Sequence, residues 1–214
     1  MGCLKNTLCL EESGGRRGTR ANNNQKTSSH SFVESFSDHY EVALHTYLGS
    51  YERGAELALA AGDSLSKRLP GHPLFPADTF YRGMVLFAMA RKTGSQCYSR
   101  QAMKCLAPMK RFAKVNPNTT HYEVLLDAEF AALKKKYKLA ERFYQAASAT
   151  ASQAGCEQDE AFATERFACF LLEVKGDKTA AQVQLRRAVE LYQSWGATKK
   201  VQMLSSEYAD IMTE

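Results

Sequence analysis

A stripe of small and aromatic residues in the second half of the chain constrains the fold more than any other feature. Its members follow one another at steps of three and four residues: Tyr137, Ala140, Tyr144, Ala147, Ala151 and Ala154. This spacing places all of these side chains on one face of an α-helix. The alanines let a neighbouring helix approach closely, and the aromatic rings fill the space between helices. The stripe therefore predicts a helix that packs along one face against other helices.

The same pattern begins again after other turns. A small residue stands five positions after Gly49, Lys135 and Gly176, and a further turn is expected at Gly94. In the last copy the packing positions are Ala181, Leu185 and Ala188, and Trp195 closes the helix. The pattern resembles the second helix of tetratricopeptide repeats, although the turns recur roughly every 40 to 45 residues instead of about 34. Because a single hairpin cannot bury its own apolar stripe, successive hairpins are expected to stack on one another.

These patterns predict an all-α fold, an α–α superhelix of tetratricopeptide-like hairpins. Glycines at the ends of the apolar stripes are expected to cap helices, and Pro108 is expected to kink or split the helix that contains it. No long segment alternates with period two, so strands are not expected. About nine helices are predicted, over residues 31–47, 50–69, 77–92, 95–114, 118–135, 137–154, 157–175, 178–194 and 197–212.

Residues 1–30 differ in composition from the helical domain predicted over residues 31–214. They are rich in Ser, Gly, Asn and Arg and are predicted to be a disordered tail. The first residues invite a second interpretation, because Gly2 could be myristoylated and Cys3 palmitoylated. Asn6 stands where that signal usually has Ser or Thr. A membrane contact is therefore expected only if Gly2 and Cys3 are acylated, and an unmodified start is the alternative.

The charge balance argues against a nucleic-acid partner. The formal net charge is +5, and most of it comes from the basic residues of the first 30 positions. The small excess that remains on the helical domain is typical of a solvated surface. The six cysteines form no CxxC pair, and the chain has no secretory segment and no long apolar run, so a cytoplasmic location is expected.

The sequence contains no recognisable set of catalytic residues. The protein is therefore predicted not to be an enzyme and to bind neither a cofactor nor a metal ion. The five histidines form no metal-spaced pair. Gly49 and Gly54 have the spacing of a phosphate loop, but Ala55 replaces the lysine that would reach the phosphate. They are better explained by a turn and a helix-packing glycine. Glu129 and Glu165 lie near apolar stripes and are expected to bond polar groups of neighbouring helices.

Two clusters of basic residues can be interpreted either as solvated surface or as a binding site for an anionic partner. They comprise Lys134, Lys135, Lys136 and Lys138, and Lys104, Lys110, Arg111 and Lys114. Solvated surface is the first interpretation of both clusters. An acidic peptide or a phosphate partner is the alternative.

Several motifs from position 116 onward occur together in one known kind of protein. They include Asn116-Pro-Asn, Leu125-Leu-x-Ala-Glu, the Tyr137 stripe and the close Tyr192-x-x-Trp195-Gly-Ala. Over residues 116–212, and more loosely over 40–115, the chain resembles the tetratricopeptide-like helical segment of large multidomain signalling ATPases. Those proteins also carry serine/threonine kinase-like, GAF and sensor histidine kinase domains.

The resemblance implies a non-catalytic scaffold in signal transduction that binds a protein or peptide in its concave groove. This chain lacks the kinase signature and the ATPase module, so it is expected to be a fragment or a detached part of such a protein. One alternative is a regulatory coupling segment of an ATP-binding sensor kinase encoded by a longer gene. Another is a lipid-anchored adaptor.

Overall fold

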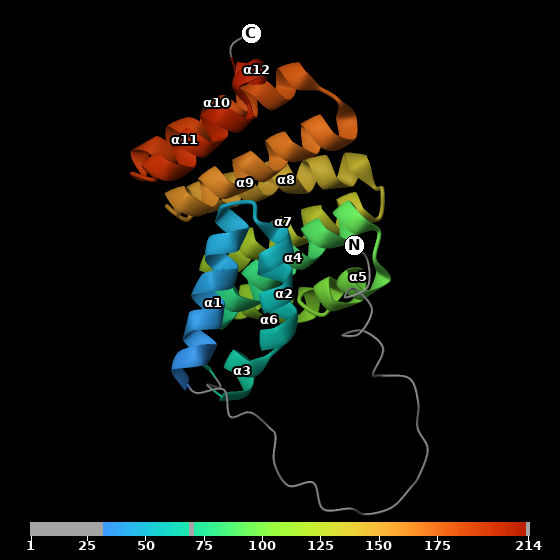
Figure 1. Ribbon diagram of the computed structural model, residues 1–214, viewed down its shortest axis with the longest axis vertical. Helices are drawn as coiled ribbons and strands as arrows, with labels where there is room; N and C mark the ends of the chain where they lie inside the picture. Colours follow the sequence, from blue (N-terminus) through green and yellow to red (C-terminus); the bar gives the residue numbers. More distant parts are fainter. Residues whose placement is uncertain (1–31, 69–70, 213–214) are drawn as a thin grey trace, which may run out of the picture.

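The computed structural model describes residues 32–68 and 71–212. The predicted tail, with Gly2 and Cys3, lies outside these described residues. Within them every regular element is helical, and the helices pack mainly against their neighbours along the chain (Figure 1). The predicted all-α, solenoid-like fold is therefore confirmed.

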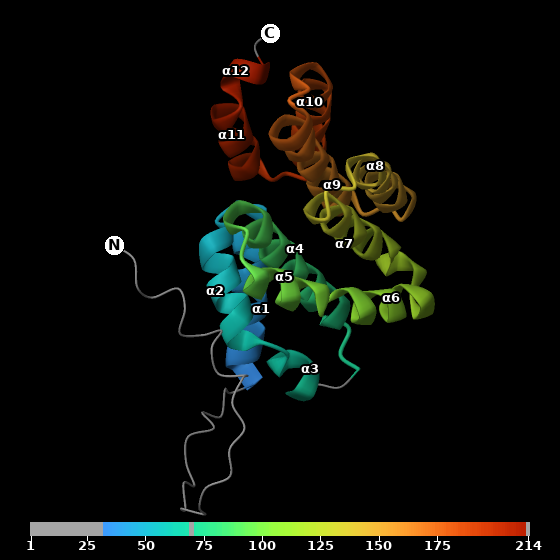
Figure 2. The same cartoon turned by 90° about the vertical axis from the view of Figure 1, so that its right-hand side faces the viewer.

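Four helical hairpins and a closing helix follow one another from one end of the molecule to the other (Figure 2). The first consists of α1 (Phe32–Tyr47) with α2 (Tyr51–Ala61) and α3 (Ser64–Arg68), and the second of α4 (Phe75–Thr93) with α5 (Gln96–Met103) and α6 (Leu106–Val115). After the 3₁₀ turn η2 (Pro117–Thr119), the third consists of α7 (Thr120–Leu133) and α8 (Tyr137–Gln153). The fourth consists of α9 (Glu157–Phe170), the π turn η3 (Leu171–Lys175) and α10 (Lys178–Ser194), followed by α11 (Thr198–Glu207) and α12 (Ala209–Met212).

Three of the about nine predicted helices are each divided in two. The one expected over 50–69 ends at Gly62, whose φ of 55° lies in the left-handed region. The last helix is interrupted at Tyr208. The described residues therefore contain twelve α-helical segments, several of them short.

Pro108 has the expected effect, but the break lies one turn earlier than the proline. The helix divides at Lys104 and Cys105, and Pro108 is the third residue of α6. A proline ring clashes with the carbonyl four residues before it, which here belongs to Lys104. In the first turn of a new helix the missing N–H costs nothing, because that group has no intrahelical partner.

Several turns between consecutive helices use left-handed residues. Gly94 has φ 67° and closes α4, and Gly155, Gly176 and Gly196 adopt similar conformations, as predicted. Lys135 takes the same conformation between α7 and α8, with φ 57°. For a residue with a side chain this conformation costs roughly 1–2 kcal/mol, so this turn is held by the packing of the helices on either side.

The middle of the molecule is a layer of inner helices, α4, α7 and α9. Every residue of α9 from Ala161 to Phe170 is buried, as is every residue of α4 from Gly83 to Ala90. A helix that is buried all round must satisfy its polar side chains internally. The outer helices α8 and α10 are buried on one stripe only, as the repeat pattern requires.

The predicted packing residues do not all behave alike. Ala140, Tyr144, Ala147, Ala181, Leu185 and Ala188 are fully buried. Tyr137 remains 41% exposed and Trp195 46% exposed, because each stands at the end of its outer helix.

Candidate functional site

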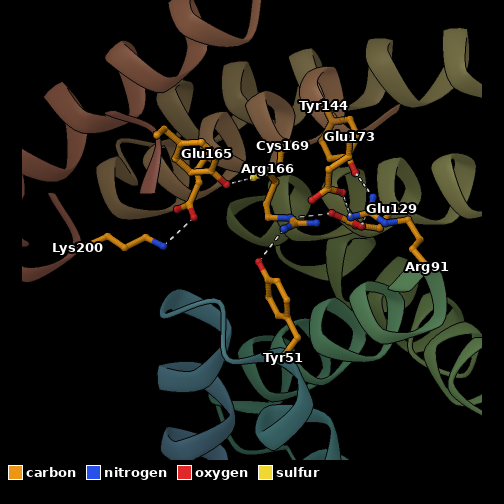
Figure 3. A network of polar contacts seen from close by, with 10 residues as sticks. Tyr51, Arg91, Glu129, Tyr144, Glu165, Arg166, Cys169, Glu173 and Lys200 are labelled. Carbon is orange, nitrogen blue, oxygen red and sulfur yellow. Dashed lines mark hydrogen bonds and ion pairs between the residues drawn. The ribbon is translucent and has the colours of Figure 1, made fainter. Parts of the chain in front are cut away.

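A buried network of charged side chains joins the inner helices (Figure 3). Its centre is Glu129 of α7, which is completely buried. Arg166 of α9 donates its Nε–H to Oε1 of Glu129 at 3.0 Å, and Arg91 of α4 places Nη1 2.9 Å from Oε2. One carboxylate thus ties three helices together.

Tyrosines extend this network to two more helices. Arg166 donates from Nη1 to the hydroxyl of Tyr51 in α2 at 2.7 Å, and Arg91 donates to the hydroxyl of Tyr144 in α8 at 3.1 Å. The first hairpin is therefore joined through Tyr51 to Arg166 of the fourth, and the third is joined through Tyr144 to Arg91 of the second.

A second branch begins at Glu165, next to Arg166. Its carboxylate accepts hydrogen bonds from Tyr192 of α10 and from Lys200 of α11, each at 2.7 Å. Lys200 also donates to the backbone carbonyl of Tyr47, at the end of α1. The closing helix is thereby attached to the first hairpin.

The directions of the pKa shifts keep Glu129 ionised and two of the tyrosines neutral near pH 7. Burial raises the pKa of Glu129, but the charges of Arg166 and Arg91 together outweigh it and leave that pKa below its ordinary value. Burial raises the pKa of Tyr51 and of Tyr144 well above the ordinary tyrosine value. Such groups are poor proton donors and acceptors at pH 7. The network is suited to holding helices together, the role expected for Glu129 and Glu165.

Tyr47, the last residue of α1, lies where the first hairpin meets α9 and the turn after α10. Its ring centroid lies 5.1 Å from that of Phe162 in α9, 5.7 Å from that of Tyr81 in α4 and 6.2 Å from that of Trp195. Three aromatic rings of the chain itself therefore surround the ring of Tyr47.

An open pocket of about 560 Å³ lies elsewhere, between α3, the first half of α4, and α5 with α6. Its lining combines aromatic, polar and charged side chains. They are Gly62, Asp63, Ser66, Lys67, Phe75, Asp78, Thr79, Arg82, Gln101, Lys104, Cys105, Pro108, Arg111 and Phe112. The break between α5 and α6 contributes the side of the pocket around Lys104 and Pro108.

Positive charge in this pocket exceeds what its acidic residues neutralise. Lys67 pairs with Asp63 at 2.9 Å, and Arg82 lies 3.6 Å from Asp78. Nε of Arg82 is buried without a hydrogen-bond partner. Lys104 and Arg111 form no ion pair with any residue in the described part of the chain. The side chains of Arg82, Lys104 and Arg111 can therefore donate further hydrogen bonds to a ligand in the pocket. They lie beside two phenylalanine rings.

The two basic clusters of the sequence have different surroundings. Lys134, Lys135, Lys136 and Lys138 are exposed on and just after the turn between α7 and α8, as the solvated interpretation expects. In the second cluster, Lys110 pairs with Asp127 at 3.1 Å, whereas Lys104 and Arg111 line the pocket. Sequence spacing alone could not separate these members, because the break between α5 and α6 decides which way each one faces.

The structure also brings together three side chains that sequence spacing kept apart. His121 of α7, Cys156 before α9 and Asp159 of α9 offer ligand atoms that lie within 4.8 Å of one another. Burial, reinforced by Asp159, raises the pKa of the Cys156 thiol. A thiol that remains protonated is not an activated nucleophile. No pattern in the sequence indicated this group, because its members belong to different hairpins.

The glycine pair resembling a phosphate loop has the structural role predicted for it. Gly49 has φ 70° in the turn before α2. A Cβ on Gly54 would lie 2.9 Å from Cγ1 of Val85 and 3.1 Å from Cβ of His45. Gly54 therefore permits the close approach of α2 to α1 and α4.

No family model matches this chain, and no curated protein or solved structure matches it either. Within residues 32–68 and 71–212, every helix is too short or too polar to span a membrane.

Proposed function

We propose that the chain is a non-enzymatic helical-repeat module that binds an acidic segment of a partner protein. The observation that carries this proposal is the pocket between α3, α4 and α5–α6. It combines Lys104, Arg111 and the buried Nε of Arg82 with the rings of Phe75 and Phe112. A carboxylate-bearing segment with an apolar side chain complements such a pocket in both charge and polarity.

The resemblance to helical segments of signalling proteins supports a protein partner for this module. Stacked helical hairpins commonly present surfaces for peptides, and here aromatic rings of the chain itself pack around Tyr47. The proposal therefore places recognition at the pocket beside α6 instead of at the centre of the concave face. Long-range attraction to the unpaired cations would speed association and make it sensitive to salt.

The experiment selects ligands from a library of phage-displayed random peptides and measures their binding by fluorescence polarisation. A Lys104→Glu/Arg111→Glu variant reverses two pocket charges. The control, Lys136→Glu/Lys138→Glu, makes the same change in net charge on the exposed turn after α7. All four side chains are exposed, so both variants are expected to fold, which circular dichroism checks.

The proposal expects the selected peptides to carry Asp or Glu beside an apolar residue. The pocket variant should then bind them at least about tenfold more weakly, and the control should bind within about twofold of wild type. Equal binding by both variants, or selection of peptides without acidic residues, would overturn the proposal.

A further inference from the structure

The group formed by His121, Cys156 and Asp159 lies at one end of the interface between α7 and α9. His121 is in the first turn of α7, Cys156 precedes α9, and Asp159 is in the first turn of α9. The left-handed Gly155, with φ 69°, ends the turn after α8 and sets the position of Cys156. The three side chains therefore come from backbone that is fixed by helix packing.

Asp159 is a buried carboxylate whose neighbours do not supply a permanent positive charge. It is 6% exposed, and its carboxylate contacts Nε2 of His121 at 3.0 Å, the hydroxyl of Tyr47 at 3.5 Å and the hydroxyl of Tyr122. In the described residues its ion-pair partner is His121, which is charged only when protonated. Buried charges in proteins are usually paired or bound to a metal ion. A metal cation would supply the permanent positive charge that these partners of the carboxylate do not provide.

His121 has an uncommitted ring nitrogen. Its side chain is buried, and Nδ1 has no hydrogen-bond partner. A neutral imidazole carries one proton, so one of its two nitrogens always presents a lone pair. When Nδ1 holds the proton, the lone pair of Nε2 faces a carboxylate oxygen of Asp159, and a cation between the two atoms would stabilise that arrangement.

The donor set suits zinc. An imidazole nitrogen, a thiolate and a carboxylate oxygen are ligands that Zn²⁺ accepts at about 2.0 to 2.3 Å. Two ligands of one tetrahedral zinc ion are then roughly 3.3 Å apart, close to the 3.0 Å that separates Nε2 of His121 from Oδ2 of Asp159. Cys156 is partly exposed, so solvent reaches the third ligand and the open fourth position.

We propose that His121, Cys156 and Asp159 bind a Zn²⁺ ion with three protein ligands and one water molecule. The ion binds where α7 and α9 meet and cross-links the third hairpin to the fourth. The Cys156 thiol releases its proton when the metal binds, as coordinating cysteines do. This site is separate from the pocket beside α6 and does not depend on the proposed peptide binding.

The test uses the full-length chain, reduced with a phosphine and titrated with Co²⁺, a spectroscopic substitute for zinc. Binding through Cys156 produces a thiolate-to-cobalt charge-transfer band in the near ultraviolet, and added Zn²⁺ abolishes it. Cys156→Ser should remove the band without unfolding the protein, because this side chain is partly exposed. A Cys3→Ser/Cys9→Ser variant controls for the thiols of the first 30 residues and should retain the band.

A second measurement covers the buried ligands, whose substitution could weaken the fold. Zn²⁺ should raise the melting temperature of wild type and of the Cys3→Ser/Cys9→Ser control, but not that of Cys156→Ser or Asp159→Asn. The proposal is overturned if Co²⁺ gives no thiolate band, or if the band survives in Cys156→Ser. An equal zinc shift in wild type and Asp159→Asn would also overturn it.

Discussion

Arg166 of α9 and Glu129 of α7 form an ion pair in the interior, with the guanidinium side chain 3% exposed and the carboxylate side chain 0% exposed. Replacing Arg166 by Met is expected to destabilise the fold by about 3–5 kcal/mol, because it leaves Glu129 with one arginine fewer in a buried site. Urea denaturation followed by circular dichroism measures this loss. Arg53→Met is the control, because it breaks an exposed ion pair with Glu56 and should cost less than about 1 kcal/mol. Similar losses in the two variants would contradict the structural role of the network.

The same carboxylate makes stability depend on acid pH. The folded-state pKa of Glu129 lies below its ordinary value of 4.5, so its ionised form contributes stability above that value. This contribution is lost as the pH falls from about 4.5 toward the lowered pKa of the folded state. The unfolding free energy of wild type should fall more steeply across this window than that of Glu129→Gln, which cannot titrate. Parallel curves for the two proteins would show that another group governs the acid limb.

Lys200 is expected to hold α11 against the rest of the molecule. Its ammonium group reaches both the Glu165 carboxylate and the Tyr47 carbonyl, so Lys200→Ala removes two contacts of a charged donor. A hydrogen bond to a charged group contributes about 1.5–3 kcal/mol. Hydrogen–deuterium exchange should accelerate over Thr198–Glu207 in this variant. Lys199→Ala alters an exposed neighbour and should leave the exchange unchanged; protection of α11 in both variants would contradict the prediction.

Gly54 and Gly83 provide a matched pair of tight helix contacts. A Cβ on Gly54 would meet Val85 and His45 near their backbones, whereas one on Gly83 would meet the flexible end of Leu126 at 2.8 Å. Because β-branched Val85 is stiff in a helix, Gly54→Ala is expected to cost about 1–3 kcal/mol. Gly83→Ala should cost less, since Leu126 can move aside. Thermal denaturation of both variants tests the order, and a larger loss at Gly83 would refute it.

The sequence predicts those features that local spacing determines. The burial of Ala140 and Tyr144 follows from helical periodicity, and the break before Pro108 follows from the geometry of one residue. The position of the break shows the limit of such reasoning, because the proline disturbs the carbonyl one turn earlier. The additional break at Gly62 was missed because a glycine at a small-residue position fits either a packing contact or a helix end.

The sites depend on how the superhelix curves, which no local pattern determines. Lys104 and Arg111 face a pocket only because α5 and α6 are separate helices. His121 and Asp159 meet because α9 packs beside α7, and nothing in the spacing of histidines indicates that. Glu129 was expected to bond a neighbouring helix, but its arginine partners come from two different hairpins and could be identified only in the folded chain.

The contact between Lys200 and the Tyr47 carbonyl joins positions that are 153 residues apart. A ribosome adding about 5 to 20 residues per second needs roughly 8 to 30 seconds to synthesise that length of chain. During this interval the nascent first hairpin presents Tyr47 without the helices that later surround it. Its aromatic end is a surface that chaperones can bind during synthesis, until Lys200 has emerged from the ribosome and reaches the Tyr47 carbonyl.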